Sequence, residues 1–356
     1  MKTTLASLAT RSRACATIRL MAMAASVLPS TTAVAAPSSE STTTLYLTLP
    51  PDPVTNVWRT DKTTVPTTAL PSSATIQHQK NTARFAPDTI KPKAAPAGYG
   101  YVWRVVLLIY PSIDCDQTVS GVTTHFTYTM SAAEIAEAET AFDNMIIGIR
   151  DGSNNEARIQ PTVIIVGRAL TALAKFGADV HWPDASITSP ELTTYCAGGK
   201  ADSALVYWPA KNRTTNAAIN NPYWGLSYGS PTSYTYNVGY STVSNISSPM
   251  VVGYYPGEVM IHEWMHPTTD YYHVVWGYNV PNLDSAGSYK PCPTCANYAY
   301  VSGDGWMPFY RDFLRGTVWN PSASRYEGVP PAAWRSGTPT NYTLPLAAAE
   351  EWQLFE

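Results

Sequence analysis

The sequence predicts an α+β fold in which strands and helices are mixed within one domain. Three observations support this prediction. Residues 101–110 (YVWRVVLLIY) form a β run with a continuous apolar centre, which is typical of an inner β-strand. One helical pattern begins at Ser131, and another begins near Glu258 and contains the motif His-Glu-x-x-His. The predicted order is strand, helix, strand, strand, irregular segment and helix.

Each of these elements has a local signature. Ser131 and Glu134 form a capping box, and apolar residues then recur at helical spacing until the turn residues of 151–155 (DGSNN) end the helix. Apolar runs at 162–166 and 203–208 predict the next two strands.

The remaining segments are less regular. Residues 209–247 are rich in Asn, Tyr, Ser and Gly, and they predict irregular strands or long loops. Residues 306–316 predict a short helix or turn whose aromatic side chains face the core. No internal repeat is visible, so we do not expect a repeat array.

The N-terminal part of the chain differs in composition. Residues 1–35 combine a basic start, a short apolar core and the small-residue sequence Ala-Val-Ala, which together indicate a signal peptide. An organelle-targeting or disordered N-terminus is the alternative. Residues 36–98 are dense in Pro, Ser, Thr and Ala, and only 44–49 resemble a strand, so we expect a linker or pro-segment that need not pack. The catalytic domain would then span 99–356.

Composition restricts the partners and the compartment. The net charge is −3 and no basic cluster occurs, which argues against nucleic acid and anionic membranes. Beyond the N-terminus, no apolar run approaches the roughly 18 residues that a membrane span needs. The 23 Tyr and 11 Trp residues suit peptide or sugar contacts outside cells. We expect a secreted, extracellular monomer.

The cysteines predict disulfides. Cys15 falls in the predicted signal peptide, which leaves Cys115, Cys196, Cys292 and Cys295, an even number in an oxidising compartment. Of the three possible pairings, we favour Cys292–Cys295 with Cys115–Cys196. The Cys292-Pro-Thr-Cys295 sequence is alternatively a redox pair or half of a zinc knuckle.

The motif at residues 262–266 contains candidate metal ligands. His262 and His266 are four residues apart, so on a helix both imidazoles lie on one face and can bind one ion. Zinc lowers the pKa of a bound water, and the neighbouring Glu263 can take the proton as that water attacks a carbonyl. Pro256 and Glu258 favour a helix start here. The alternative is a buried helix that carries two histidines by chance.

This motif resembles that of the zincin metalloproteases. The resemblance implies that His262 and His266 bind zinc and that Glu263 acts as general base. It also implies a zincin-like mixed sheet backed by helices, with the motif on an active-site helix and an edge strand along the cleft. We place that edge at 225–245, where an extended peptide would pair, and a surface loop is the alternative. Over 100–316 the chain is similar to a poorly characterised subgroup of secreted zincin-like proteins.

A catalytic zinc site needs a third protein ligand. Pro267 predicts that the helix kinks or ends at His266, so that a later segment must return with the ligand. The resemblance to the secreted subgroup favours Asp284, which follows a Val-Pro sequence. His273 is the runner-up and Asp270 the third candidate. Asp284 could instead cap a turn, and His273 could be an ordinary surface or core imidazole.

These observations predict a secreted zinc metallopeptidase that hydrolyses peptide or protein substrates, with Glu263 activating the water. Tyr310, or a tyrosine of 289–300, is a candidate donor to the oxyanion, although core packing is the alternative role for each. The alternative function is a non-catalytic secreted module that binds carbohydrate or a surface on a zincin-like scaffold. A zinc amidase or esterase would use the same residues.

Overall fold

The computed structural model describes residues 42–49, 59–66, 88–92, 100–176, 179–228, 238–246 and 249–340. The predicted signal peptide at 1–35 lies outside these residues. Helices and a mixed sheet occur together in the described chain, so the predicted α+β class is confirmed.

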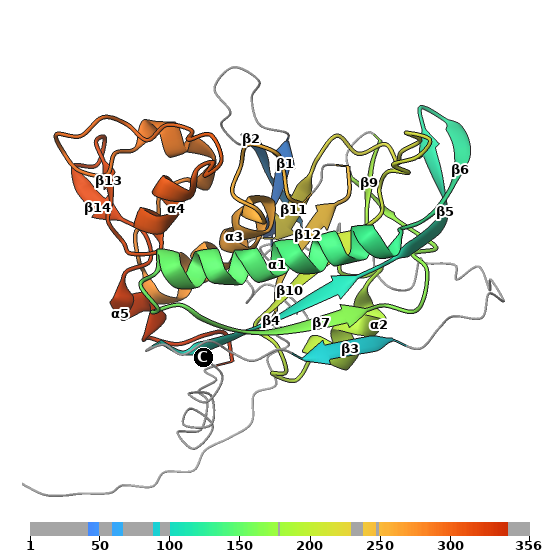
Figure 1. The fold of residues 1–356 in the computed structure, drawn as a ribbon, viewed down its shortest axis with the longest axis horizontal. Helices are drawn as coiled ribbons and strands as arrows, with labels where there is room; N and C mark the ends of the chain where they lie inside the picture. Colours follow the sequence, from blue (N-terminus) through green and yellow to red (C-terminus); the bar gives the residue numbers. More distant parts are fainter. Residues whose placement is uncertain are drawn as a thin grey trace, which may run out of the picture. The chain divides into compact units, whose positions relative to one another are not determined.

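An eight-stranded mixed sheet forms the centre of the fold (Figure 1). Its strand order is β2-β1-β11-β12-β10-β4-β7-β3. The four strands β12, β10, β4 and β7 are parallel, whereas every pairing made by β1, β2, β3 and β11 is antiparallel. The strands are β1 Thr42–Leu49, β2 Arg59–Pro66, β3 Thr89–Pro92, β4 Val102–Ile109, β7 Arg158–Ile165, β10 Ser203–Trp208, β11 Gly225–Tyr228 and β12 Gly239–Ser244.

Three strand pairs and seven helical segments complete the described fold. The pairs are β5 Ser112–Val119 with β6 Val122–Thr129, β8 Ala174–Phe176 with β9 Val180–Trp182, and β13 Val318–Asn320 with β14 Arg325–Glu327. The helical segments are α1 Ala132–Gly152, α2 Ser189–Glu191, the π-helix η3 Leu192–Cys196, α3 Glu258–Trp276, the 3₁₀ helix η5 Leu283–Ser288, α4 Met307–Phe313 and α5 Pro331–Trp334.

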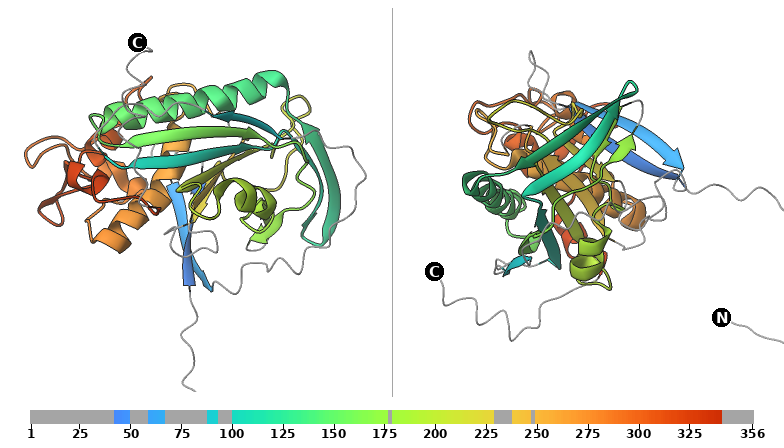
Figure 2. Two further views of the ribbon diagram at one scale, coloured as in Figure 1. Left: turned by 90° about the horizontal axis from the view of Figure 1, so that it is seen from below. Right: turned by 90° about the vertical axis from the view of Figure 1, so that its right-hand side faces the viewer.

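Two apolar cores cover the two faces of the sheet. Strand β4 contributes alternate residues to each, since Trp103 and Leu107 face one core and Val106 and Leu108 face the other. The first core contains the apolar residues of α1, α3 and α4, and the second contains Leu192 and Cys196 of η3. Figure 2 shows α1 on one face of the sheet and α2 on the other. Burial on both faces explains why the strand at 101–110 is apolar through its centre, Val105 to Ile109.

Several predicted elements match the structure closely. Strand β10 has the predicted bounds, and β4 and α4 lie within their predicted segments. The capping box of α1 is also present: the Ser131 hydroxyl accepts from the Glu134 N–H at 3.2 Å, and the Glu134 carboxylate accepts from the Ser131 N–H at 2.8 Å. These elements were predictable because their signals are local in sequence.

The segment 36–98 differs from the expectation that it need not pack. Three of its stretches, β1, β2 and β3, pair into the central sheet. Strand β1 (TTTLYLTL) is rich in threonine and also contains tyrosine, and β-branched and aromatic residues favour a β-strand. This local preference outweighs the Pro- and Ser-rich composition of the surrounding segment. The sheet therefore begins before the expected domain start near residue 99.

The expected edge strand at 225–245 is not at an edge. Strand β11 lies between β1 and β12, and β12 lies between β11 and β10. The edge prediction was wrong because the N-terminal segment supplies two further strands beyond β11. Without β1 and β2, β11 would be the last strand of the sheet.

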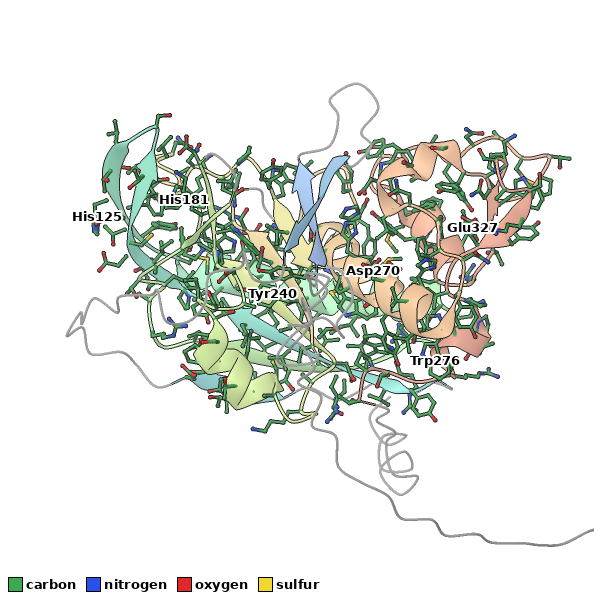
Figure 3. All side chains as sticks on the ribbon, turned by 180° about the vertical axis from the view of Figure 1, so that it is seen from behind. His125, His181, Tyr240, Asp270, Trp276 and Glu327 are labelled. Atoms are coloured by element: carbon green, nitrogen blue, oxygen red, sulfur yellow. A yellow bond between two sulfur atoms is a disulfide. The ribbon has the colours of Figure 1, made fainter. Side chains whose placement is uncertain are left out.

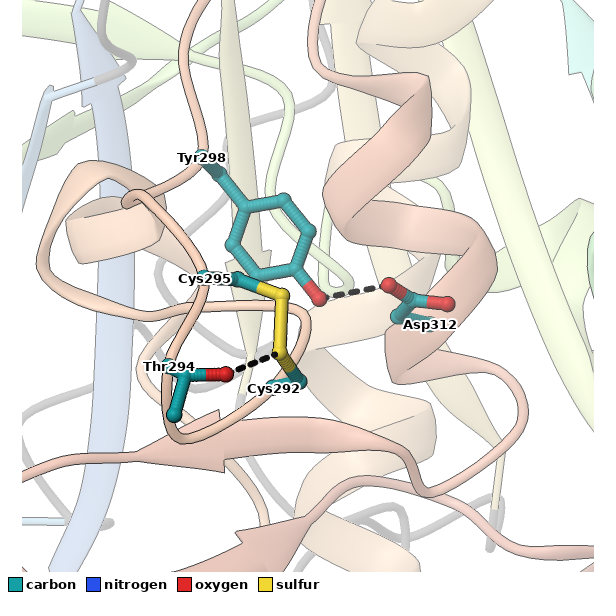
Figure 4. Close-up of a disulfide and its surroundings, with 5 residues drawn as sticks. All are labelled: Cys292, Thr294, Cys295, Tyr298 and Asp312. Atoms are coloured by element: carbon teal, nitrogen blue, oxygen red, sulfur yellow. Dashed lines mark hydrogen bonds between the residues drawn. A yellow bond between two sulfur atoms is a disulfide. The ribbon is translucent and has the colours of Figure 1, made fainter.

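One of the two predicted disulfides is present. Cys292 and Cys295 are bonded in the loop before α4, which confirms that pairing (Figure 4). The predicted Cys115–Cys196 bond is wrong, because both residues are free and buried in the second apolar core. A buried cysteine can pack as a small apolar side chain. An even number of cysteines therefore does not by itself predict that all of them are paired.

No helix in the described part of the chain is long and apolar enough to cross a membrane.

Burial should make the two free thiols unreactive in the native protein. Burial raises the pKa of Cys196 to about 12, and the pKa of Cys115 also rises to about 12, through burial and the charges of Asp116 and Asp114. Since the thiolate is the reactive form, iodoacetamide at about pH 8 should label both residues only after unfolding. Peptide mass spectrometry should find Cys292 and Cys295 labelled only after reduction. Rapid native labelling of Cys196 would contradict its burial.

Candidate metal centre

The motif lies on α3, which crosses the first core against α1. The helix begins after Gly257, whose φ of 88° lies in the left-handed region. A Cβ at this position would lie 2.3 Å from the carbonyl oxygen of Ala141 on α1, so glycine permits the close approach of the two helices. All three motif side chains are buried, with His262 and Glu263 fully inaccessible and His266 3% exposed.

Helix α3 does not end at the proline. It continues through Pro267 to Trp276, so of the two predicted outcomes, a kink or an end at His266, the end was wrong. In a regular helix the Glu263 carbonyl would accept a hydrogen bond from the N–H of residue 267. Proline has no N–H, so this carbonyl loses its helical donor. The hydroxyls of Ser227 and Ser241 lie 2.8 and 2.9 Å from that carbonyl oxygen and replace the missing donor.

The same serine pair fixes the Glu263 side chain. The Ser227 hydroxyl lies 2.7 Å from Oε2 of Glu263 and 2.9 Å from the Ser241 hydroxyl. Two hydroxyl protons satisfy both acceptors when Ser241 donates to the carbonyl and Ser227 donates to Oε2. A Cβ on Gly225 would lie 2.2 Å from the carboxylate, so β11 approaches Glu263 as closely as a glycine allows. Strand β11 therefore forms a wall of the site.

Asp284 reaches the site from the 3₁₀ helix η5. Asn282 caps this helix, because its side-chain oxygen accepts from the Asp284 N–H at 3.1 Å. The Tyr289 hydroxyl accepts from the Asn282 N–H at 2.9 Å and holds the start of the turn. The Asp284 side chain is 15% exposed, more than either histidine.

His262, His266 and Asp284 come together as a possible metal site. The two Nε2 atoms lie 3.2 Å apart, and Asp284 Oδ1 lies 3.4 Å from His262 Nε2 and 3.9 Å from His266 Nε2. In a tetrahedral site with zinc bonds of about 2.05 Å, neighbouring ligand atoms are about 3.3 Å apart. The three donors therefore fit a zinc-sized ion with little adjustment. Within the described residues, this is the cluster of His, Cys, Asp and Glu able to hold a metal.

Tyr310 on α4 holds the other ring nitrogen of His262. Its hydroxyl lies 2.8 Å from Nδ1, so a His262 that presents Nε2 to a metal carries its proton on Nδ1 and donates it to Tyr310. Tyr310 is buried, and burial together with the charges of Glu258 and Asp284 holds its pKa well above the usual range. The hydroxyl therefore stays protonated and neutral.

Asp284 also changes the basicity of His262. Burial alone lowers the pKa of His262, but the hydrogen bond and negative charge of Asp284 reverse this effect and raise it above the ordinary value. The charges of Glu263 and Glu258 act in the same direction. The site thus attracts positive charge, either a proton or a metal ion.

The other candidate ligands lie elsewhere. His273 is exposed, and its Nδ1 donates to the Tyr278 carbonyl at 2.8 Å, so it does not join the cluster. Asp270 lies on α3 but outside the group of three donors. Figure 3 shows His125 and His181 well apart from Asp270. The structure therefore places Asp284, the first-ranked candidate for the third ligand, beside His262 and His266. His273 and Asp270 lie outside this group.

The tyrosines considered as oxyanion donors have other contacts. Tyr310 contacts His262 through its hydroxyl, as described above. Tyr298 donates to Asp312 at 2.6 Å (Figure 4), and Tyr300 donates to the Gly253 carbonyl at 2.6 Å. Neither partner belongs to the group His262, His266 and Asp284, so the Tyr298 and Tyr300 hydroxyls stabilise the surrounding loop.

Sequence reasoning did not find the serine pair. Pro267 predicted only that the helix kinks or ends, and nothing local identifies Ser227 or Ser241 as partners of the Glu263 carbonyl.

A comparison with models of protein families, with curated proteins and with solved structures finds no match to this chain. The function proposed below therefore depends on the residues and geometry of the site.

The first prediction from this geometry concerns Tyr310. Tyr310→Phe removes the acceptor of the His262 Nδ1–H, and the loss of such a partner typically lowers metal affinity about 10–100-fold. Competition with a chelating indicator should measure this loss for Zn²⁺. Tyr298→Phe is the matched control, because it removes a buried hydroxyl that contacts no ligand. Equal affinities of the two variants would contradict the positioning role.

The second prediction concerns the donor that replaces the missing N–H. Ser241→Ala should destabilise the protein by about 1–3 kcal/mol, because the buried Glu263 carbonyl loses a donor. In a Pro267→Ala background the restored N–H can bond that carbonyl, so the loss should shrink by at least about half. Urea unfolding of the four proteins in this cycle gives the coupling.

Ser203→Ala is the control, because Ser203 is buried on the neighbouring strand β10 and its hydroxyl has no hydrogen-bond partner within the described chain. Additive effects of Ser241→Ala and Pro267→Ala would contradict this explanation of the continuous helix.

Proposed function

We propose that the chain is a secreted zinc-dependent metallopeptidase of the zincin type. The observation that supports this most directly is the convergence of His262, His266 and Asp284 beside Glu263. Two ligands and the acid come from one helix, and the third ligand comes from a separate segment. A helix buried only for packing has no need to bring an aspartate to two imidazoles.

The donor set supports zinc as the ion. Two neutral imidazoles and one carboxylate are typical ligands of catalytic zinc. The same three donors also suit Fe(II) in oxygenases. A carboxylate next to the ligands on the same helix favours hydrolysis, because it provides the base that metal-assisted hydrolysis uses.

The chain's own residues account for the proton transfer. Bound zinc would supply a water of lowered pKa and a Lewis acid for the substrate carbonyl. The Glu263 carboxylate accepts the proton, and the Ser227 hydroxyl donates to Oε2 and keeps the carboxylate in place.

Other features agree with the proposal. A mixed sheet lies against α3, as the resemblance to zincins implies, and its inner strand β11 runs beside Glu263. Secretion is supported by the sequence at 1–35 and by the Cys292–Cys295 bond, since disulfides persist in oxidising compartments.

Glu263→Gln provides the test. The purified full chain should contain one zinc per molecule, measured by mass spectrometry of the metal, and should cleave fluorogenic peptides. Glu263→Gln should retain the zinc and lower kcat by about 10²–10⁴-fold, because general base catalysis is lost. Asp270→Asn on the same helix is the matched control and should retain activity.

Two results would contradict the proposal. Iron in place of zinc, with no hydrolysis by the zinc-loaded protein, would indicate a different reaction at the same ligands. Stable folding and unchanged partner binding after His262→Ala, without any hydrolysis by the native chain, would favour the non-catalytic binding module.

A further inference from the structure

The strand next to the candidate site on the outer side of β11 belongs to the chain's own N-terminal segment. Strand β1 pairs antiparallel with β11 in a register that places Leu47 opposite Leu226 and Tyr46 opposite Ser227. The pairing covers all four residues of β11. Strand β2 pairs with the far side of β1.

This pairing lies directly beside the general base. Gly225 and Ser227 of β11 contact the Glu263 carboxylate, and both are paired to β1. Neighbouring strands are about 4.8 Å apart, so the β1 backbone runs one strand spacing from the wall of the site. An extended peptide that adds to β11 as a further strand would need the edge that β1 occupies.

The second strand reaches the other side of the site. Strand β2 contacts η5, the segment that carries Asp284. The β1–β2 pair therefore lies beside both the general base and the third candidate ligand. Figure 1 shows β1 and β2 together next to β11 and α3.

The rest of the sheet does not depend on this pair. If β1 and β2 left, the order β11-β12-β10-β4-β7-β3 would remain intact, and β11 would become an edge strand paired to β12. Residues 67–88 join β2 to β3 at the opposite edge of the sheet, so the pair is linked to the rest by a long connection. A free edge exposes backbone N–H and C=O groups that pair with any extended chain.

We propose that the edge of β11 is a docking surface for an extended peptide strand and that β1 is its intramolecular occupant. Strand β1 holds the place of the substrate backbone, and its release opens the site. This inference rests on the proposed function for the identity of the incoming peptide, but the docking itself is testable without hydrolysis.

Opening and closing the edge in the full chain provides the test. Leu47→Pro removes an N–H from β1, which is hydrogen-bonded on both sides, and should free β11. Ile90→Pro is the matched control, because it disturbs β3 at the opposite edge of the same sheet. Conversely, L47C/L226C should lock β1 on β11 when oxidised, and Leu226 faces the second core, away from Glu263.

Two readouts are measured on the zinc-loaded proteins. One is binding of a fluorescent octapeptide with the sequence of residues 42–49, and the other is kcat/KM for an unstructured fluorogenic peptide. Leu47→Pro should raise both by about tenfold or more over the native chain, because the competent state becomes the major one. Ile90→Pro should leave both unchanged. The oxidised tether should abolish both, and phosphine reduction should restore native values, with the native chain under reductant as control.

The outcomes separate the two proposals. Tighter octapeptide binding in Leu47→Pro alone, without hydrolysis by any variant, supports the docking edge and contradicts the peptidase. Equal binding and turnover in Leu47→Pro and Ile90→Pro overturns the inference while hydrolysis remains. If Leu47→Pro does not fold, the tethered variant decides, since equal values in its oxidised and reduced forms would also overturn the inference.

Discussion

The site depends on how a helix containing proline is held against the sheet. Pro267 removes the N–H that would bond the Glu263 carbonyl, and a buried carbonyl without a donor is unfavourable by about 1–3 kcal/mol. Ser241 on β12 donates to that carbonyl, and the hydroxyl of Ser227 on the adjacent strand β11 lies beside it at 2.8 Å. The repair does more than stabilise the helix, because Ser227 also binds the Glu263 carboxylate. One contact thus fixes the helix, the sheet and the orientation of the candidate base.

The remaining parts of the site are arranged around this contact. With α3 fixed, His262 and His266 point to one side, where η5 brings Asp284 and α4 brings Tyr310. Both segments follow α3 in the chain, and the Cys292–Cys295 bond closes a tight turn in the segment between them. Strand β11 forms the other boundary. The sheet, through β11, therefore positions the base, and the C-terminal segments complete the ligand set.

The sequence predicted those features whose signal is local. The helix after Ser131 and the strand at 203–208 follow from capping and apolar patterning, and the histidine spacing places two imidazoles on one face. Asp284 was ranked first by resemblance, although its segment has little helical signal. The serine pair, the Tyr310 contact and the position of β1 depend on the register of segments far apart in sequence. Pro267, directly after the motif, shows that the Glu263 carbonyl loses its helical donor, but no pattern near it in sequence identifies the two serines.

X-ray diffraction from crystals of the zinc-loaded protein, collected at the zinc absorption edge, tests the central claim most directly. The account predicts one strong anomalous peak bonded to His262 Nε2, His266 Nε2 and a carboxylate oxygen of Asp284, with bonds of about 2.0–2.2 Å. The absence of an ion there, or a zinc bound by other residues while His262 and His266 stay in apolar packing, would contradict the account.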